Sequence, residues 1–233
     1  MVALVLAAAL VGYLTVITPL LGKHTYDRLA RTRDRDPDAL GRTYRLWITE
    51  TWAIAAVALI TAHLAGLGPE QIGLSLGSDP AYTAALLGGM VLAVAGVAVA
   101  QRRGLRLPAP APGASALLPR TAKERRQAIA LSITAGVCEE LIFRGVLIGL
   151  GAHVLGLPLP VAAGLSLAVF VFGHLYQGWK SMLVVALLGL VLTFAYLRTG
   201  GLLLPIAMHI LIDVRGLVLS PADGPREAAA VRG

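Results

Sequence analysis

Long apolar stretches recur along the chain at lengths that suit membrane-crossing helices. Such runs lie at about 1–21, 46–66, 81–100, 127–150, 159–177, 181–198 and 202–219. A helix needs roughly 20 apolar residues to cross the hydrocarbon core of a bilayer. The pattern therefore predicts an all-α fold, a polytopic transmembrane bundle of about seven helices. The first run lacks a preceding basic segment and a small-residue cleavage site, so we interpret it as a retained span.

Basic residues are concentrated in two of the connections between these runs. The connections 22–45 and 101–126 each hold seven Lys or Arg residues, whereas 66–80 and 149–160 hold none. Basic connections stay on the cytoplasmic side of a membrane. The pattern predicts an N-terminus outside and a C-terminus in the cytoplasm, and Arg198 alone departs from it. The Pro-, Ala- and Arg-rich composition is typical of a bacterial chain and predicts the plasma membrane.

A Pro/Ala-rich stretch divides the chain. The sequence LPAPAPGA from Leu107 to Ala114 predicts an extended cytoplasmic linker over 107–120. On this interpretation, residues 1–106 form an N-terminal three-helix membrane region with cytoplasmic loops. Residues 121–220 form a four-helix membrane domain that carries the chemistry, and 221–233 form a cytoplasmic tail.

Composition excludes several classes of protein. Hydrophobic residues make up 57% of the chain and charged residues only 14%, which excludes a single water-soluble globule. The net charge of +7 comes from residues between apolar runs, so we expect contacts with lipid headgroups and no nucleic-acid partner. Cys138 is the only cysteine, so no disulfide framework constrains the fold.

The fourth apolar run carries three charged residues in one and a half turns. Glu139, Glu140 and Arg144 would lie roughly 18 Å along a helix that starts near Arg126, close to mid-membrane. Burying an ionisable group there costs on the order of 3 kcal/mol, so a function or a partner is required. Glu140 and Arg144 are spaced to pair, while Glu139 points about 100° away and is free to polarise a water. The alternative is an ion pair that only holds helices together.

Two later runs add imidazoles. His174 follows Phe170 by four residues, so the two rings share a helical face, and His209 precedes Asp213 by the same spacing. Asp213 could orient His209. Each pair could also serve only as a hydrogen bond between helices.

These motifs, Glu139-Glu140-x3-Arg144, Phe170-x3-His174 and His209-x3-Asp213, occur in order on successive apolar runs and together resemble the CAAX-protease and bacteriocin-processing (Abi) family. Gly200-Gly201-Leu202 and Pro205 resemble the segment that leads into the last motif of the family.

The resemblance implies a helical membrane peptidase, whose eukaryotic relatives cleave prenylated CAAX proteins. Glu139 and His174 would activate the water, and His209 and Asp213 would stabilise the oxyanion. Glu140, Arg144 and Phe170 would be supporting residues. An ionised Asp213 would repel an oxyanion, so it must be protonated or act by orienting His209.

A metal-dependent alternative stays open. Glu139, His174 and His209 are the ligand types of an open catalytic zinc site. The H-E-x-x-H signature of soluble metalloproteases is absent. The glutamate mechanism requires no cofactor, and the alternative requires a divalent metal such as zinc.

Other signals are interpreted as structural. The G-x-S-x-G pattern of a serine-hydrolase nucleophile elbow occurs at Gly73-Leu74-Ser75-Leu76-Gly77. A connection between two spans lacks the strand and helix that such an elbow requires. Cys138 fits a small residue in an apolar helix. Glu50 lies near the start of the second run, from which it could reach water or Arg45.

The sequence therefore predicts an intramembrane endopeptidase that acts on a membrane-associated or lipidated protein or peptide. A proton-coupled carrier could use the same buried Glu, His and Asp residues as a relay. A non-catalytic scaffold or immunity-type member of the family is the other alternative. The identity of the substrate stays open.

Overall fold

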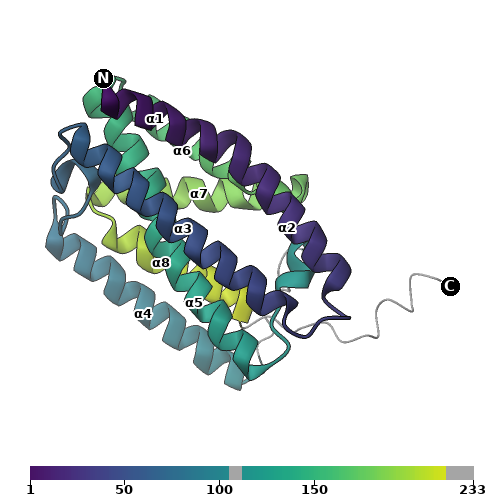
Figure 1. The fold of residues 1–233 in the computed structure, drawn as a ribbon. Coiled ribbons are helices and arrows are strands. Elements are labelled where there is room, and N and C mark those ends of the chain that lie inside the picture. The colour runs from purple at the N-terminus through teal and green to yellow at the C-terminus, as the bar shows by residue number, and fades with distance from the viewer. Residues whose placement is uncertain (105–111, 219–233) are drawn as a thin grey trace.

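The protein is an all-α helical bundle, as predicted. The computed structural model describes residues 1–104 and 112–218, which form seven continuous helical segments that run side by side (Figure 1). Residues 107–111 of the predicted linker and the whole predicted tail, residues 221–233, lie outside the described residues.

The elements follow one another in a simple order. The first segment joins α1 (Val2–Gly12), a wider π-helical stretch (Tyr13–Ile17) and α2 (Thr18–Thr32); then come α3 (Ala39–Leu64), α4 (Pro80–Arg102), α5 (Ala122–Glu139), α6 (Leu159–Gly173), α7 (Trp179–Thr199) and α8 (Leu203–Asp213). Helix α5 continues through π-helical stretches at Glu140–Leu147 and Leu150–Val154, and α8 through Val214–Val218. Short 3-10 turns lie at Glu70–Ile72, Pro112–Leu117 and Leu175–Gln177.

The chain is a multi-pass integral membrane protein. Four helices are long and apolar enough to cross a bilayer: Val2–Thr32, Ala39–Leu64, Pro80–Ala100 and Trp179–Thr199. Helix α6 is apolar but shorter. Large apolar side chains such as Leu92 on α4 and Leu187 on α7 are exposed on the outside of the bundle. An apolar outer surface of this kind matches lipid rather than water.

Three expected boundaries differ from those observed. The first helix continues to Thr32, because the polar residues after Gly22 still form a helix with an apolar side against the bundle, so the connection to α3 is only 33–38. Part of the expected extended linker, Pro112–Leu117, is a 3-10 helix. Helix α6 ends at Gly173 instead of near residue 177, which leaves His174 at its carboxyl end.

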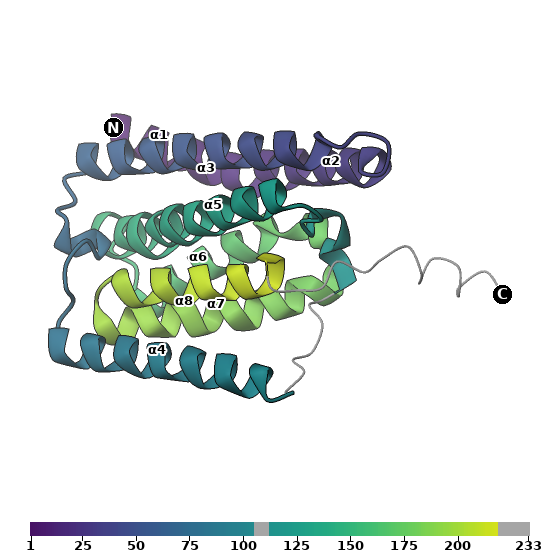
Figure 2. The same cartoon turned by 90° about the horizontal axis from the view of Figure 1, so that it is seen from below.

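The helices of the first 104 residues lie on two sides of the later ones. Helices α1, α2 and α3 form one outer layer, α4 lies at the opposite side, and α5 to α8 lie between them (Figure 2). Helix α5 packs against α3 and α8, and α6 packs against α7. The central position of α5 explains why its charged residues are shielded from lipid.

The two basic connections meet at one end of the bundle. Arg33 Nη2 lies 2.9 Å from Glu124 Oε2, and both side chains are buried. Two exposed pairs, Arg120–Asp34 and Lys123–Asp38, join the same connections. At the other end, the Ser78 N–H donates to the Thr199 carbonyl. The basic residues that are concentrated in two connections of the sequence therefore lie together at one end of the bundle.

The Arg33–Glu124 pair should contribute to stability in a pH-dependent way. Glu124 lies in the first turn of α5, before the apolar run that begins at residue 127. Burial alone would raise the pKa of its carboxyl, but hydrogen bonds from the Arg120 backbone N–H and from Arg33 outweigh burial and hold the pKa below its usual value. A lowered pKa in the folded state adds stability above the unfolded-state pKa, and this stability is lost as the pH falls through the folded-state pKa.

We therefore expect Glu124→Gln to reduce the free energy of unfolding by about 1–3 kcal/mol at neutral pH. The difference from wild type should shrink only as the pH falls below about 4, the usual range of a Glu carboxyl, because the lowered pKa keeps the wild-type side chain charged down to that pH. Thermal unfolding in detergent at several pH values measures both effects. Lys123→Gln is the matched control, because its pair with Asp38 is exposed on both sides and should be worth less than about 1 kcal/mol. A pH-independent difference would contradict the assignment.

The serine in Gly73-Leu74-Ser75-Leu76-Gly77 is not at a nucleophile elbow. A 3-10 turn precedes this stretch, and the Gly73 carbonyl accepts from the Leu202 backbone N–H at 2.9 Å. Gly77 has a positive φ of 82°, and a Cβ there would lie 2.1 Å from the Thr199 carbonyl oxygen. The glycines therefore allow a loop to close onto the α7–α8 connection, which agrees with the structural interpretation.

Candidate active site

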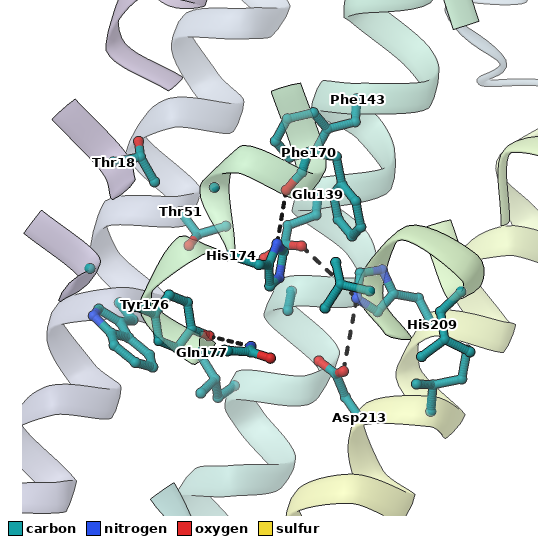
Figure 3. A pocket seen from close by; sticks show the side chains of 18 of the residues that line it. Thr18, Thr51, Glu139, Phe143, Phe170, His174, Tyr176, Gln177, His209 and Asp213 are labelled. Carbon is teal, nitrogen blue, oxygen red and sulfur yellow. Dashed lines mark hydrogen bonds and ion pairs between the residues drawn. The ribbon is translucent and has the colours of Figure 1, made fainter. Parts of the chain in front are cut away.

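A cavity of about 340 Å³ opens inside the bundle, and the predicted site residues lie on its wall. Glu139, Phe170, His174, His209 and Asp213 come from α5, α6 and α8 and meet around this space (Figure 3). Residues that are up to 74 positions apart in sequence thus share one chamber. Most of the remaining lining is apolar, so the polar groups stand in an environment with little competing water.

The two adjacent glutamates have different surroundings. Glu139 lines the cavity, whereas the Glu140 side chain is 0% exposed and lies 2.9 Å from Arg144 Nη1. This is the predicted pair four residues apart. The helix widens into π-helical turns from Glu140 onward, a feature often found at functional sites.

Arg144 fastens this part of α5 to α7. Its Nη2–H donates to the Gly189 carbonyl at 3.0 Å, and its Nε–H to Thr193 Oγ1 at 3.4 Å. The guanidinium also lies 4.4 Å from the centre of the Phe170 ring. With an exposed fraction of 1%, Arg144 is a fully buried cation with a partner on every side. Arg144 therefore joins α5 to α7 and is not among the residues that line the cavity.

His174 is held with one nitrogen towards its own helix. Its Nδ1 lies 2.9 Å from the Phe170 carbonyl oxygen. A carbonyl can only accept, so Nδ1 carries the proton and donates it, which leaves Nε2 as the second ring nitrogen. This bond forms because α6 ends at Gly173, so the Phe170 carbonyl is left without its usual helical partner.

Aromatic rings fix the position of the His174 imidazole. The Phe170 ring centre is 4.7 Å away, and the Tyr176 ring stacks on the other side at 6.1 Å. Tyr176 in turn contacts Tyr26 and Trp47 from α2 and α3. Sequence reasoning did not identify these three residues, because they come from distant segments and match no motif.

Glu140 orients His209. His209 Nδ1 lies 2.7 Å from Glu140 Oε1, and since that carboxylate is paired with Arg144, Nδ1–H is the donor. His209 Nε2 lies 3.9 Å from Glu139 Oε2 and also 3.9 Å from Asp213 Oδ1, beyond direct hydrogen-bonding distance. Asp213, which the spacing suggested as the partner, therefore faces the opposite nitrogen across a gap.

A glycine lets α8 approach α5 closely enough for this contact. A Cβ at Gly136 would lie 2.5 Å from Ile210 Cγ1 and 3.1 Å from the Ile210 backbone nitrogen. Gly136 lies one turn before Glu139 and Glu140, and Ile210 follows His209. The small residue thus brings the imidazole within reach of the two carboxylates.

Glu139 keeps an unused acceptor. Its Oε2 is buried and makes no hydrogen bond to another described residue. A buried carboxylate oxygen without a donor is costly unless a water or a substrate supplies one. This oxygen is therefore available to accept a hydrogen bond from a water or a bound group in the cavity.

The candidate metal ligands lie on three different helical segments. Within residues 1–104 and 112–218, no three His, Cys, Asp or Glu side chains converge closely enough to hold a metal ion. Glu139, His174 and His209 line one cavity but do not form a ligand set in this arrangement.

Glu50 differs from its expected position. It does not pair with Arg45. Its Oε1 accepts a hydrogen bond from the Tyr13 hydroxyl at 2.9 Å, and its side chain lines the same cavity as the site residues. Cys138 is fully buried and does not line the cavity, in agreement with a structural role.

The bundle and the buried Glu, His and Asp side chains define a multi-pass membrane protein with a polar site inside the membrane. The family model described as type II CAAX prenyl endopeptidase Rce1-like matches residues 122–215. The match includes α5 to α8 and all of the motif residues, so the resemblance to the CAAX-protease family is confirmed. Neither the curated proteins nor the solved structures give a significant match.

Proposed function

We propose that the protein is an intramembrane endopeptidase that hydrolyses a peptide bond in a membrane-associated or lipidated protein or peptide. The observation that carries the proposal is the convergence of Glu139, His174 and His209 from three helices on one cavity inside the bundle. The family match over residues 122–215 gives the reaction class.

Glu139 and His174 are the groups assigned to activate water. Glu139 has a free buried acceptor at Oε2, and His174 Nδ1–H is committed to Phe170, so Nε2 can accept a proton. The water oxygen attacks the scissile carbonyl carbon as one water proton passes to this pair. The same proton then moves to the leaving nitrogen as the carbon–nitrogen bond breaks.

His209 and Asp213 are assigned to the oxyanion. Because His209 Nδ1–H is held by Glu140, a protonated Nε2 would donate into the gap between Glu139 and Asp213. Preorganised donors of this kind stabilise charge that develops in the transition state. Asp213 would need its proton in order to donate beside them.

The orientation in the membrane is part of the proposal. Both basic connections lie at the end of the bundle where α3 and α5 begin, and this end is assigned to the cytoplasm. The N-terminus is then outside a bacterial plasma membrane. The cavity lies between the two ends, within reach of a substrate that is itself in the bilayer.

The proposal is tested by cleavage with purified protein in detergent. A farnesylated CAAX reporter and a library of membrane peptides serve as substrates, and we expect at least one to be cleaved with and without a chelator such as 1,10-phenanthroline. Loss of activity in the chelator, with recovery after added zinc, would contradict the metal-free mechanism but keep the peptidase assignment. Binding of substrates without cleavage would instead favour a scaffold.

A further inference from the structure

The cavity has a second polar wall that the proposed chemistry does not use. Trp47, Glu50, Thr51 and Ile54 line it from α3, with the spacing of one helical face. Thr18 lines it from α2, and its hydroxyl is buried without a hydrogen-bond partner in the part of the chain that the structure describes. Thr18 and Thr51 lie on the other side of the chamber from His209 and Asp213 (Figure 3). A buried hydroxyl without a partner on this wall is available to a polar group of a ligand.

The acidic side chains of the cavity lining are not balanced by Lys or Arg side chains among the described residues of the wall. Glu50, Glu139 and Asp213 line the cavity, while no Lys or Arg is found among the described residues of its wall. The buried cation Arg144 is already engaged by Glu140, Gly189 and Thr193. A chamber with three carboxyl groups and low internal polarity attracts positive charge.

Glu50 supplies the carboxyl group of that wall and has few hydrogen-bond partners. One neutral donor, the Tyr13 hydroxyl at 2.9 Å, reaches its Oε1, and Oε2 makes no hydrogen bond or ion pair with another described residue. Two oxygens can accept about four hydrogen bonds. Most of this capacity is therefore open, and an ammonium or guanidinium group is the complement that best offsets burial of the charge.

The distance between Glu50 and Glu139 along the bundle axis follows from how α3 and α5 pack side by side. Helices α3 and α5 both begin at the basic end, and Trp52 Nε1–H donates to Thr134 Oγ1 at 3.2 Å, so these two positions are level. Glu50 precedes Trp52 by two residues and Glu139 follows Thr134 by five. Glu50 is therefore about 10 Å nearer the basic end than Glu139, a span of roughly three residues of extended peptide.

We propose that Glu50 forms a specificity subsite that binds a Lys or Arg side chain of the substrate, about two to four residues from the scissile bond on the side of the basic end. The inference rests on the proposed peptidase function, because it concerns the substrate of that site. Tyr13 positions the Glu50 carboxylate, and the Thr18 and Thr51 hydroxyls are acceptors for further N–H groups of the same side chain or of the peptide backbone.

The competing explanation is that Tyr13 and Glu50 only clamp the first helical segment to α3. Two variants separate the explanations. Glu50→Gln keeps the size of the side chain and an oxygen that can accept from Tyr13, but it removes the charge. Tyr13→Phe removes the hydrogen bond and keeps the charge.

The test uses one uncharged transmembrane peptide and a series in which a single Lys is moved through the positions on both sides of its centre. Binding to wild type, Glu50→Gln, Tyr13→Phe and Glu50→Lys is measured by fluorescence anisotropy in detergent, and cleavage is measured with the same peptides. We expect wild type to prefer a Lys peptide over the uncharged one by about tenfold or more. Glu50→Gln should remove this preference, Tyr13→Phe should largely keep it, and Glu50→Lys should shift it to Glu-containing peptides.

An equal preference in wild type and Glu50→Gln, or no preference in wild type, would overturn the subsite. The peptidase assignment would survive that result if the uncharged peptide is still cleaved. If peptides bind with the expected charge preference but none is cleaved, the subsite stands and the peptidase assignment fails. The binding and cleavage measurements thus distinguish the two failures.

Discussion

Glu139→Gln is expected to lower the rate of peptide cleavage by roughly 10²–10⁴-fold, because the side chain keeps its size but can no longer take a proton from the water. His174→Ala should cause a loss of the same order, since it removes Nε2, which is the ring nitrogen left free by the bond from Nδ1–H to Phe170. The measurement is single-turnover cleavage of the best reporter. Thermal unfolding should show that both variants remain folded, because neither residue is a member of the buried ion pair.

Two matched controls separate this chemistry from a general effect of substitution. Glu70→Gln and His63→Ala change the same residue types at exposed positions that do not line the cavity. Their activity should stay within about twofold of wild type, as is usual for surface positions. Activity near wild type in Glu139→Gln or His174→Ala would refute the site assignment.

Arg144→Leu is expected to produce the largest loss of stability of any single substitution at the site. It would leave Glu140, which is 0% exposed, as a buried charge without its cation. Removing one partner of a buried pair typically costs about 3–5 kcal/mol. For a chain of this size that corresponds to a fall in Tm of roughly 10 °C, measured by thermal unfolding in detergent.

The double variant Glu140→Leu with Arg144→Leu separates stability from activity. It removes both charges, so part of the stability lost in Arg144→Leu should return. Activity should stay low by roughly 10–100-fold, because His209 Nδ1–H loses the carboxylate that orients the imidazole. Wild-type activity in the double variant would show that Glu140 does not orient His209. A double variant as unstable as Arg144→Leu would contradict the buried-charge explanation.

Local spacing was sufficient to predict some features of the site. Glu140 and Arg144 pair because residues four apart share a helical face, and Glu139 is separated from Glu140 for the same reason. The three ordered motifs also predicted the family, which the match over 122–215 confirms. Periodicity could not reveal contacts between helices, since these depend on how the helices are rotated against one another.

His209 illustrates the limit most clearly. Its sequence neighbour Asp213 was the natural partner for the imidazole, yet Glu140 on α5 lies 2.7 Å from Nδ1 while Asp213 stays 3.9 Å from Nε2. The close packing of α8 on α5 at Gly136 determines this choice. For Glu50, the sequence predicted contact with water or Arg45, and only the tertiary structure shows that Tyr13 and the cavity lie on its side of α3.

The amino-acid pattern was enough to predict a helical membrane protein, a set of candidate site residues, and a resemblance that the family match over residues 122–215 confirms. Apolar run length and charge placement fix these features, because the bilayer requires every span to satisfy its own backbone hydrogen bonds. Only the packing of the helices shows which nitrogen of each histidine is hydrogen-bonded, which carboxylate is the partner of His209, and which residues line the cavity. Those depend on side chains from several helices meeting in one place, and no pattern along a single helix encodes them.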